Sequence, residues 1–240
     1  MASKSVSSRL HALLESLQAL SDPKIEPLNA SPRLALLKSW QSARLGKSFA
    51  HLRDHVRFGQ AAEFFLSDLY GASDVGWRDR DVSRILPIMT RWLPDSVLLT
   101  LAEALELDRL SREFDIEMAR MIDTPRIDVP IYAEAYRAVG DAVNRRRQIA
   151  LIRIVGEELE RIVRKPFVLG VLKLARGPAR GAGLASLQAF LERGFAAFRH
   201  MGPAKDFLDI IVDGETQAMR NLFAGDPDPF GFALSRKLKA

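Results

Sequence analysis

Two histidines, His51 and His55, stand four residues apart in the sequence. On a helix this spacing places both imidazoles on one face, where they would offer two ligands to one metal ion. As an alternative, His55 would be the axial ligand of a haem lying against three neighbouring apolar side chains, Phe58, Ala62 and Phe65. An enzyme that uses either histidine would have Asp54 or Glu63 nearby. The simpler interpretation places both histidines at the surface or its boundary, with His55 hydrogen-bonded to a neighbouring helix, and the sequence indicates no third metal ligand.

Charged residues at heptad spacing form a second candidate site. Arg146 and Arg153 share one side of a predicted helix with apolar residues, so at least one guanidinium is expected at or beneath a helix–helix seam. Asp108 and Asp115 have the same spacing on another predicted helix. A buried guanidinium needs a carboxylate or an anionic ligand, because an unpaired buried charge is costly. Two interpretations remain: a ladder of ion pairs between the two helices, or a pocket whose arginines hold a carboxylate or phosphate bidentately.

A third candidate site lies where Asp68 and Tyr70 follow a pair of phenylalanines. The paired phenylalanines predict the buried end of a helix, and Tyr70 carries a hydroxyl that would meet Asp68 or an arginine of residues 78–81. Those four residues alternate in sign, which is typical of a solvated helix start. The alternative is that they form the rim of a binding site.

Aromatic residues at helical spacing occur near the C-terminus, at Phe190, Phe195, Phe198, Phe207 and Phe223. Such a stripe is typical of a packed core. A cavity for an apolar ligand would use the same residues, so the sequence leaves both readings open.

The net charge of the chain indicates whether nucleic acid or an anionic membrane is an expected partner. The chain of 240 residues carries 35 basic and 30 acidic residues, a formal net charge of +5, and the two signs are interleaved along most of its length. Binding to nucleic acid or to an anionic membrane would use the run Arg145 to Arg147, Arg176, Arg180 and the basic C-terminus. The modest excess of positive charge makes this the third of the functions considered.

Several chemistries are excluded by the residues present. The sequence has no cysteine, which rules out disulfides, thiolate metal sites and cysteine nucleophiles. It also lacks a phosphate-binding loop, a dinucleotide fingerprint, a His-Glu-x-x-His motif, a calcium loop and a Gly-x-Ser-x-Gly elbow. The familiar enzyme signatures are therefore missing.

Helical periodicity runs through most of the chain, and no stretch shows the alternation of a strand. We predict helices over residues 5–20, 32–70, 79–93, 95–122, 131–163, 167–174, 184–201 and 203–223. Gly46 and Gly59 are potential breaks in the second helix, and Pro87 should end or kink the third. The expected fold is all-α: a single bundle of about seven or eight helices without a sheet, over residues 31–224. An amphipathic helix with its linker (1–30) precedes this domain, and a tail (225–240) follows it.

The N-terminal segment does not read as a signal peptide, and no apolar run is long enough to span a bilayer, so the expected location is the cytoplasm. The helix over residues 5–20 is separated from the rest by a proline-containing linker. It either mediates formation of a homodimer or folds back to complete the bundle.

Three stretches carry a resemblance: Phe-Phe-Leu-x-Asp-Leu-Tyr-Gly, beginning at Phe64; Leu93-Pro94; and Phe-Leu-Glu-Arg-Gly-Phe, beginning at Phe190. In these the chain resembles an all-helical family of proteobacterial proteins that has no assigned activity. The resemblance would cover most of the chain and implies a bacterial source. It implies no functional residues.

The leading functional hypothesis is a helical binding or adaptor protein with an inter-helix pocket or groove for a small molecule or a protein partner. It follows from the missing catalytic motifs, the broad apolar helix faces and the arginines at the seam. The first alternative is an enzyme, or a haem or metal protein, that uses His51 or His55. No specific cofactor is indicated.

Overall fold

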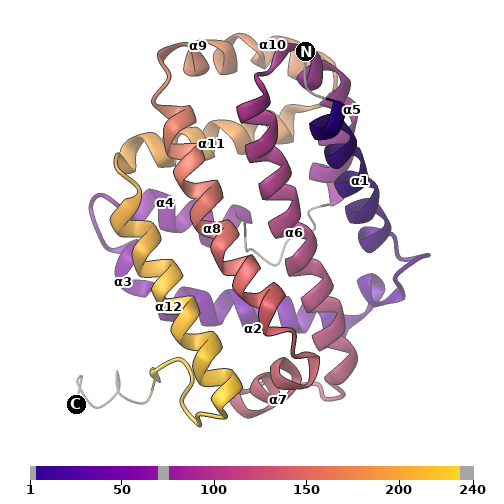
Figure 1. Cartoon of the computed structure of the whole chain (residues 1–240), viewed down its shortest axis with the longest axis vertical. Helices are drawn as coiled ribbons and strands as arrows, with labels where there is room; N and C mark the ends of the chain where they lie inside the picture. Colours follow the sequence, from indigo (N-terminus) through magenta and orange to yellow (C-terminus); the bar gives the residue numbers. More distant parts are fainter. Residues whose placement is uncertain (1–3, 70–75, 233–240) are drawn as a thin grey trace.

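In the computed structural model, which describes residues 4–69 and 76–232, the chain is built from helices (Figure 1). The described residues contain no strand, which confirms the predicted all-α class. They form twelve α-helices, a 3-10 helix and a π-helix, more than the seven or eight helices expected. In chain order these are α1 (Lys4–Ser21), η1 (Pro27–Ala30), α2 (Pro32–Ser48), α3 (Ala50–Arg53), α4 (Gly59–Phe64), η2 (Phe65–Leu69), α5 (Gly76–Trp92), α6 (Asp95–Met121), α7 (Val129–Val139), α8 (Ala142–Val163), α9 (Pro166–Leu174), α10 (Arg176–Gly181), α11 (Ala185–Met201) and α12 (Lys205–Ala224).

The first extra breaks divide the helix predicted over residues 32–70. It begins as expected, because the Ser31 hydroxyl caps α2 by accepting a hydrogen bond from the Arg33 backbone N–H at 3.2 Å. After α3 the chain turns, and α4 begins at Gly59. A Cβ atom at Gly59 would lie 2.7 Å from the Arg53 carbonyl oxygen, so this close approach of backbone requires glycine.

A second break divides the helix predicted over residues 131–163 into α7 and α8. Gly140 has φ +69° and Asp141 has φ +53°, and a right-handed helix does not continue through residues with positive φ. The Asp141 carboxylate then caps α8 by accepting a hydrogen bond from the Asn144 backbone N–H at 3.1 Å. The single long helix expected here is therefore wrong, and the chain changes direction between α7 and α8.

Two smaller differences concern prolines and a loop. Helix α5 continues through Pro87 to Trp92, so of the two effects expected of Pro87, an end or a kink, the end is wrong. The turn expected over residues 176–183 contains the short helix α10.

None of the helices in the described ranges combines the length and the apolar character needed to cross a bilayer.

Three long helices position the interior. Helix α8 packs between α6 and α12, and the three run side by side in Figure 1. Helix α2 crosses behind them, and α7 closes the lower end of the view, where it contacts both α6 and α12. One apolar cluster combines buried side chains from α2, α6, α7 and α12.

The N-terminal helix folds back onto the bundle. Leu10 and Leu17 of α1 are fully buried against α6, and Arg9 forms ion pairs with Glu103, at 2.9 Å, and with Glu106 of that helix. Arg147 of α8 reaches the same two carboxylates, at 2.7 and 2.9 Å. Two arginines from different helices thus hold α6 between α1 and α8.

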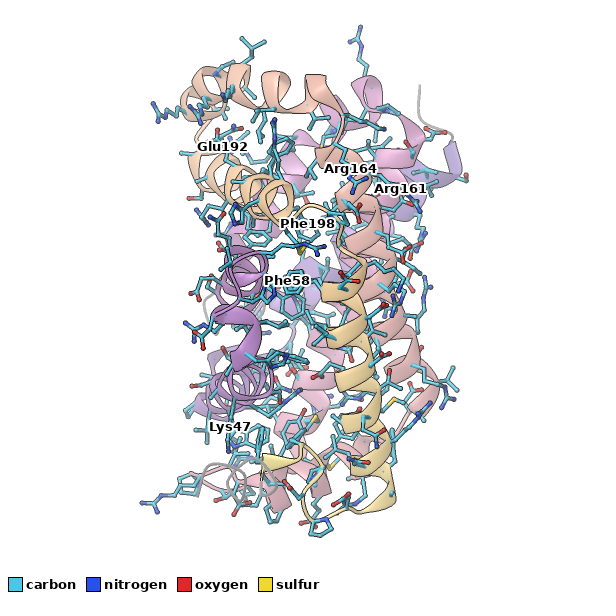
Figure 2. The ribbon with its side chains drawn as sticks, turned by 90° about the vertical axis from the view of Figure 1, so that its left-hand side faces the viewer. Lys47, Phe58, Arg161, Arg164, Glu192 and Phe198 are labelled. Carbon is cyan, nitrogen blue, oxygen red and sulfur yellow. The ribbon has the colours of Figure 1, made fainter. Side chains whose placement is uncertain are left out.

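The aromatic stripe near the C-terminus lies in the core. Phe195, Phe198 and Phe207 belong to one buried cluster with Phe58, and Figure 2 shows Phe58 and Phe198 in the interior. In the same view Lys47, Arg161, Arg164 and Glu192 lie toward the surface.

Beyond α12 the chain returns to the bundle. The Phe230 ring packs beside Trp40 and Tyr132, with centroid distances of 6.1 and 6.0 Å. Asn221 holds the return by donating a hydrogen bond from its side chain to the Pro229 carbonyl oxygen at 3.1 Å. This segment covers one end of the bundle beside α2 and α7.

Candidate functional site

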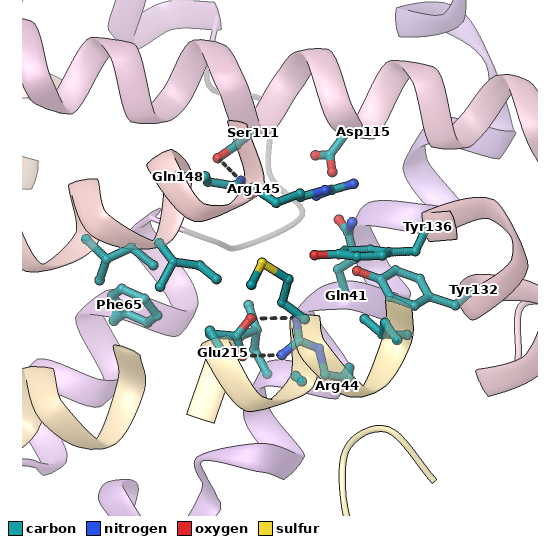
Figure 3. Close-up of a pocket in the computed structure, with 16 residues that line it drawn as sticks. Gln41, Arg44, Phe65, Ser111, Asp115, Tyr132, Tyr136, Arg145, Gln148 and Glu215 are labelled. Carbon is teal, nitrogen blue, oxygen red and sulfur yellow. Dashed lines mark hydrogen bonds and ion pairs between the residues drawn. The ribbon is translucent and has the colours of Figure 1, made fainter. Parts of the chain in front are cut away.

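A small cavity lies among α2, α6, α7, α8 and α12 (Figure 3). Its volume is about 100 Å³, space for roughly three water molecules at ~30 Å³ each. Five helices supply its polar lining, which consists of Gln41, Arg44, Ser111, Asp115, Tyr132, Tyr136, Arg145, Gln148 and Glu215. Apolar side chains, among them Leu45, Ile149, Ile152 and Met219, complete the wall. Polar side chains from five helices thus gather around one cavity between them.

Arg145 is the most unusual residue of the lining. Its side chain is only 5% exposed, and the guanidinium lies between two rings, with Cζ 3.6 Å from the Phe114 centroid and 4.1 Å from the Tyr136 centroid. Nη2 contacts the Met118 sulfur at 3.3 Å, while Nε is buried without a hydrogen-bond partner. Among the described side chains no carboxylate forms an ion pair with it. The core therefore holds a guanidinium whose two faces contact aromatic rings and whose edge has a free hydrogen-bond donor at Nε.

Arg44, in contrast, has a dedicated partner. Both of its terminal nitrogens donate to the two carboxylate oxygens of Glu215, one of them at 3.0 Å. Burial is the largest single effect and acts against the charge of Arg44, but Glu215 and Tyr132 together outweigh it and raise the pKa of this guanidinium. Arg44 Nε is buried and unpartnered, and the Phe230 ring lies 5.0 Å from Cζ. Figure 3 shows this pair on the side of the cavity opposite Arg145 and Asp115.

Asp115 projects from α6 into the cavity near Arg145 without forming an ion pair with it. Burial raises the pKa of this carboxyl above its usual value. Hydrogen bonding from Gln41 and the charges of Lys38 and Arg145 act in the opposite direction and do not cancel the effect of burial. Asp115 is thus a carboxyl that takes up a proton more readily than an exposed aspartate.

Neutral hydrogen-bonding groups occupy the rest of the lining. Gln148 donates a hydrogen bond to the Ser111 hydroxyl at 2.9 Å, as the dashed line in Figure 3 shows. Tyr132 and Tyr136 are both buried, and burial raises the pKa of the Tyr136 hydroxyl, which therefore stays protonated at any physiological pH. These groups can donate to or accept from a polar ligand.

A family model described as Domain of unknown function (DUF8198) matches residues 21–229. The chain belongs to this family. The matched range contains every helix that lines the cavity, whereas α1 lies almost wholly outside it. Comparison with curated proteins and with solved structures gives no match.

Of the charged residues predicted to form this site, only Asp115 lines the cavity. The arginine of α8 that lines it is Arg145, one position before the predicted Arg146. Arg146 is exposed, whereas Arg153 reaches Asp209 of α12, so only Arg153 of the two lies at a seam between helices. The buried guanidinium of α8 belongs to Arg145. The reason is the start of α8 after the Gly140–Asp141 turn. Its inward face carries Arg145, Gln148, Ile149 and Ile152, at helical spacing i, i+3, i+4 and i+7.

The other members of the predicted ladder have separate partners. Arg153 pairs with Asp209 of α12 at 2.5 Å, and Asp108 pairs with Arg112 of its own helix at 2.7 Å. The predicted ion-pair ladder between residues 108 and 115 and residues 146 and 153 is therefore wrong. The contact between α6 and α8 instead uses Arg147 with Glu103 and Glu106.

The two histidines do not share a helix face. Helix α3 ends at Arg53, so His51 lies on it and His55 lies in the turn that follows. Both are exposed, and His55 stacks on Phe58 with a centroid distance of 4.3 Å. Phe58 and Ala62 are buried by the protein's own side chains. Within the described part of the chain, no group of three histidine or acidic side chains is placed to hold a metal ion.

The remaining predicted residues lie elsewhere. Asp68 forms an ion pair with Arg193 of α11 and is not among the residues that line the cavity, and Tyr70 lies outside the described residues. The run Arg145 to Arg147 does not form a common basic surface, because only Arg146 is exposed. Arg176 pairs with Glu192 at 2.6 Å, Arg180 is exposed, and the basic residues beyond 232 are outside the described range.

Sequence reasoning missed most of the site. Arg44 and Glu215 are 171 residues apart in the sequence, and nothing in the sequence around either residue indicates that they are partners. One signal was available: Gly140-Asp141 is a dipeptide that commonly ends helices or forms turns. Reading it as a break would have placed Tyr132 and Tyr136 on a separate helix.

Proposed function

We propose that this protein binds a small anionic molecule, of the size of a short carboxylate or inorganic phosphate, in the cavity between α2, α6, α7, α8 and α12. The observation that carries the proposal is the buried guanidinium of Arg145, which lies beside the cavity. This guanidinium forms no ion pair with a carboxylate among the described side chains, and its Nε–H has no hydrogen-bond partner. A bound anion would supply both missing partners.

The energetics favour such a role. An unpaired buried charge costs several kcal/mol, and the cation–π contacts with Phe114 and Tyr136 offset about 2 kcal/mol of this. A structural arginine would be expected to have a carboxylate partner, as Arg44 has in Glu215. The lack of an ion-pair partner for Arg145 among the described side chains is thus better explained by a ligand than by packing.

The geometry restricts how an anion would bind. The rings of Phe114 and Tyr136 cover both faces of the guanidinium, so only its edge can donate hydrogen bonds. An edge-on guanidinium recognises planar carboxylate or phosphate oxygens. Gln41, Gln148 and the tyrosine hydroxyls would fix the orientation of the bound molecule.

The test is binding of formate, acetate and inorganic phosphate by isothermal titration calorimetry, with two variants. Arg145→Met removes the charge and keeps a long apolar chain, and Arg146→Met makes the same change at the exposed neighbour. We expect R145M to weaken binding by about 2 kcal/mol or more, roughly 30-fold. R146M should bind like the wild type. Absence of binding by all three anions, or equal losses in both variants, would overturn the proposal.

A further inference from the structure

The charges around the cavity balance when every group has its usual ionisation. Arg44 and Arg145 contribute two positive charges, and Glu215 and Asp115 contribute two negative ones. In that state the lining attracts no anion by net charge. If one carboxylate is protonated, the lining carries one positive charge, which an incoming monoanion would neutralise.

The two carboxylates differ in how easily they take up a proton. Glu215 is held by both terminal nitrogens of Arg44, so protonating it would break a buried bidentate ion pair. Asp115 forms no such pair. Protonating Asp115 therefore breaks no ion pair, whereas protonating Glu215 would break one. The geometry thus makes Asp115 the proton acceptor of the cavity.

The groups facing Asp115 come from several helices. Lys38 of α2 and Arg145 of α8 favour its charged form, whereas Asp108 of α6 and burial favour its neutral form. Asp108 is engaged by Arg112, and the Glu215 carboxylate of α12 is engaged by Arg44. The Tyr136 hydroxyl of α7 is neutral. None of these groups holds Asp115 in a direct ion pair.

A ligand changes this balance. In a cavity of about 100 Å³, a bound anion must lie within a few ångströms of the Asp115 carboxylate. Two negative charges at that separation in a buried site do not both persist, and one proton is shared between them.

We propose that the site binds the anion of a weak acid together with one proton, which resides on Asp115. The anion and the proton enter from solution, and the proton adds to a carboxylate oxygen of Asp115. The new O–H donates to the anion while the edge of Arg145 donates from the other side. This inference rests on the proposed function and narrows its ligand to small carboxylates and phosphate monoanions bound with proton uptake.

The experiment is calorimetric titration of the full-length protein with acetate at neutral pH, in two buffers that differ in ionisation enthalpy. The difference in observed heat gives the number of protons taken up, expected to be close to one for each acetate bound. The dissociation constant should rise about tenfold for each pH unit over the range in which uptake is complete.

Two variants locate the proton. Asp115→Asn replaces the protonated carboxyl with a neutral group of the same shape and should bind acetate without proton uptake and with little dependence on pH. Glu117→Gln removes an exposed carboxylate two residues away on α6 and should behave like the wild type.

The outcomes separate the two claims. If the wild type binds acetate without proton uptake, the inference is overturned and the proposed anion site remains. If D115N still takes up a proton, the proton resides elsewhere and the inference is equally overturned. If no acetate, formate or phosphate binds to the wild type, the proposed function itself is wrong. The wild-type proton count decides the matter even if D115N fails to fold.

Discussion

Arg145 Cζ lies 4.1 Å from the centroid of the Tyr136 ring, although a continuous helix would separate the two residues by about 13.5 Å along its axis. The turn at Gly140 and Asp141 brings them together, because the chain changes direction between α7 and α8. The same turn places Tyr132 and Tyr136 in the cavity wall. A short break in one helix thus creates the aromatic side of the site.

Removal of the Arg145 charge should not destabilise the ligand-free protein. In R145M the buried charge and its unsatisfied N–H are lost, while the long side chain keeps contact with Phe114 and Tyr136. We expect the free energy of unfolding, measured by urea denaturation, to be unchanged within about 1 kcal/mol or to increase. R146M should stay within about 0.5 kcal/mol of the wild type. A loss of more than about 2 kcal/mol in R145M would show that the guanidinium is structural.

Helical periodicity predicted the fold well where one apolar stripe was continuous. Helix α6 begins at Asp95 as expected and ends within a residue of the predicted end. Helical periodicity could not identify the residues of the site, because side-chain direction changes by about 100° from one helical residue to the next. Choosing Arg146 instead of Arg145 therefore exchanged an exposed residue for a buried one. The pairing of Arg44 with Glu215 depends on how distant helices pack, which local patterns do not encode.

Asp115 should give stability a measurable dependence on pH. Its pKa is raised in the folded protein above the usual value of 3.8, so the folded state binds the proton more tightly than the unfolded state. The resulting stabilisation is complete when Asp115 is protonated and is lost as pH rises through its raised pKa.

The measurement is urea denaturation of the wild type and D115N from acidic to neutral pH. We expect the wild type to lose stability relative to D115N as pH rises above 3.8. Parallel curves would mean that the Asp115 pKa is the same in both states, and E117Q supplies the comparison for a change of net charge alone.

The contact between α8 and α12 depends on a glycine. A Cβ atom at Gly156 would lie 2.4 Å from Leu208 Cδ2, and Leu208 is itself only 2% exposed. Gly156→Ala should therefore lower the free energy of unfolding by about 1–3 kcal/mol. Gly46 of α2 has no neighbour within 4 Å of such an atom, so Gly46→Ala should raise it by about 0.5–1 kcal/mol. Chemical denaturation of both variants checks this, and equal effects would contradict the close packing.

Occupation of the cavity by an anion against Arg145 is tested by a crystal structure of the protein grown with acetate at mildly acidic pH. We expect acetate density in the cavity, with one oxygen within hydrogen-bond distance of Arg145 Nε and the other facing the Asp115 carboxyl. A cavity that contains only water under these conditions, or an Arg145 edge satisfied by the protein itself, would show that the cavity is not an anion site.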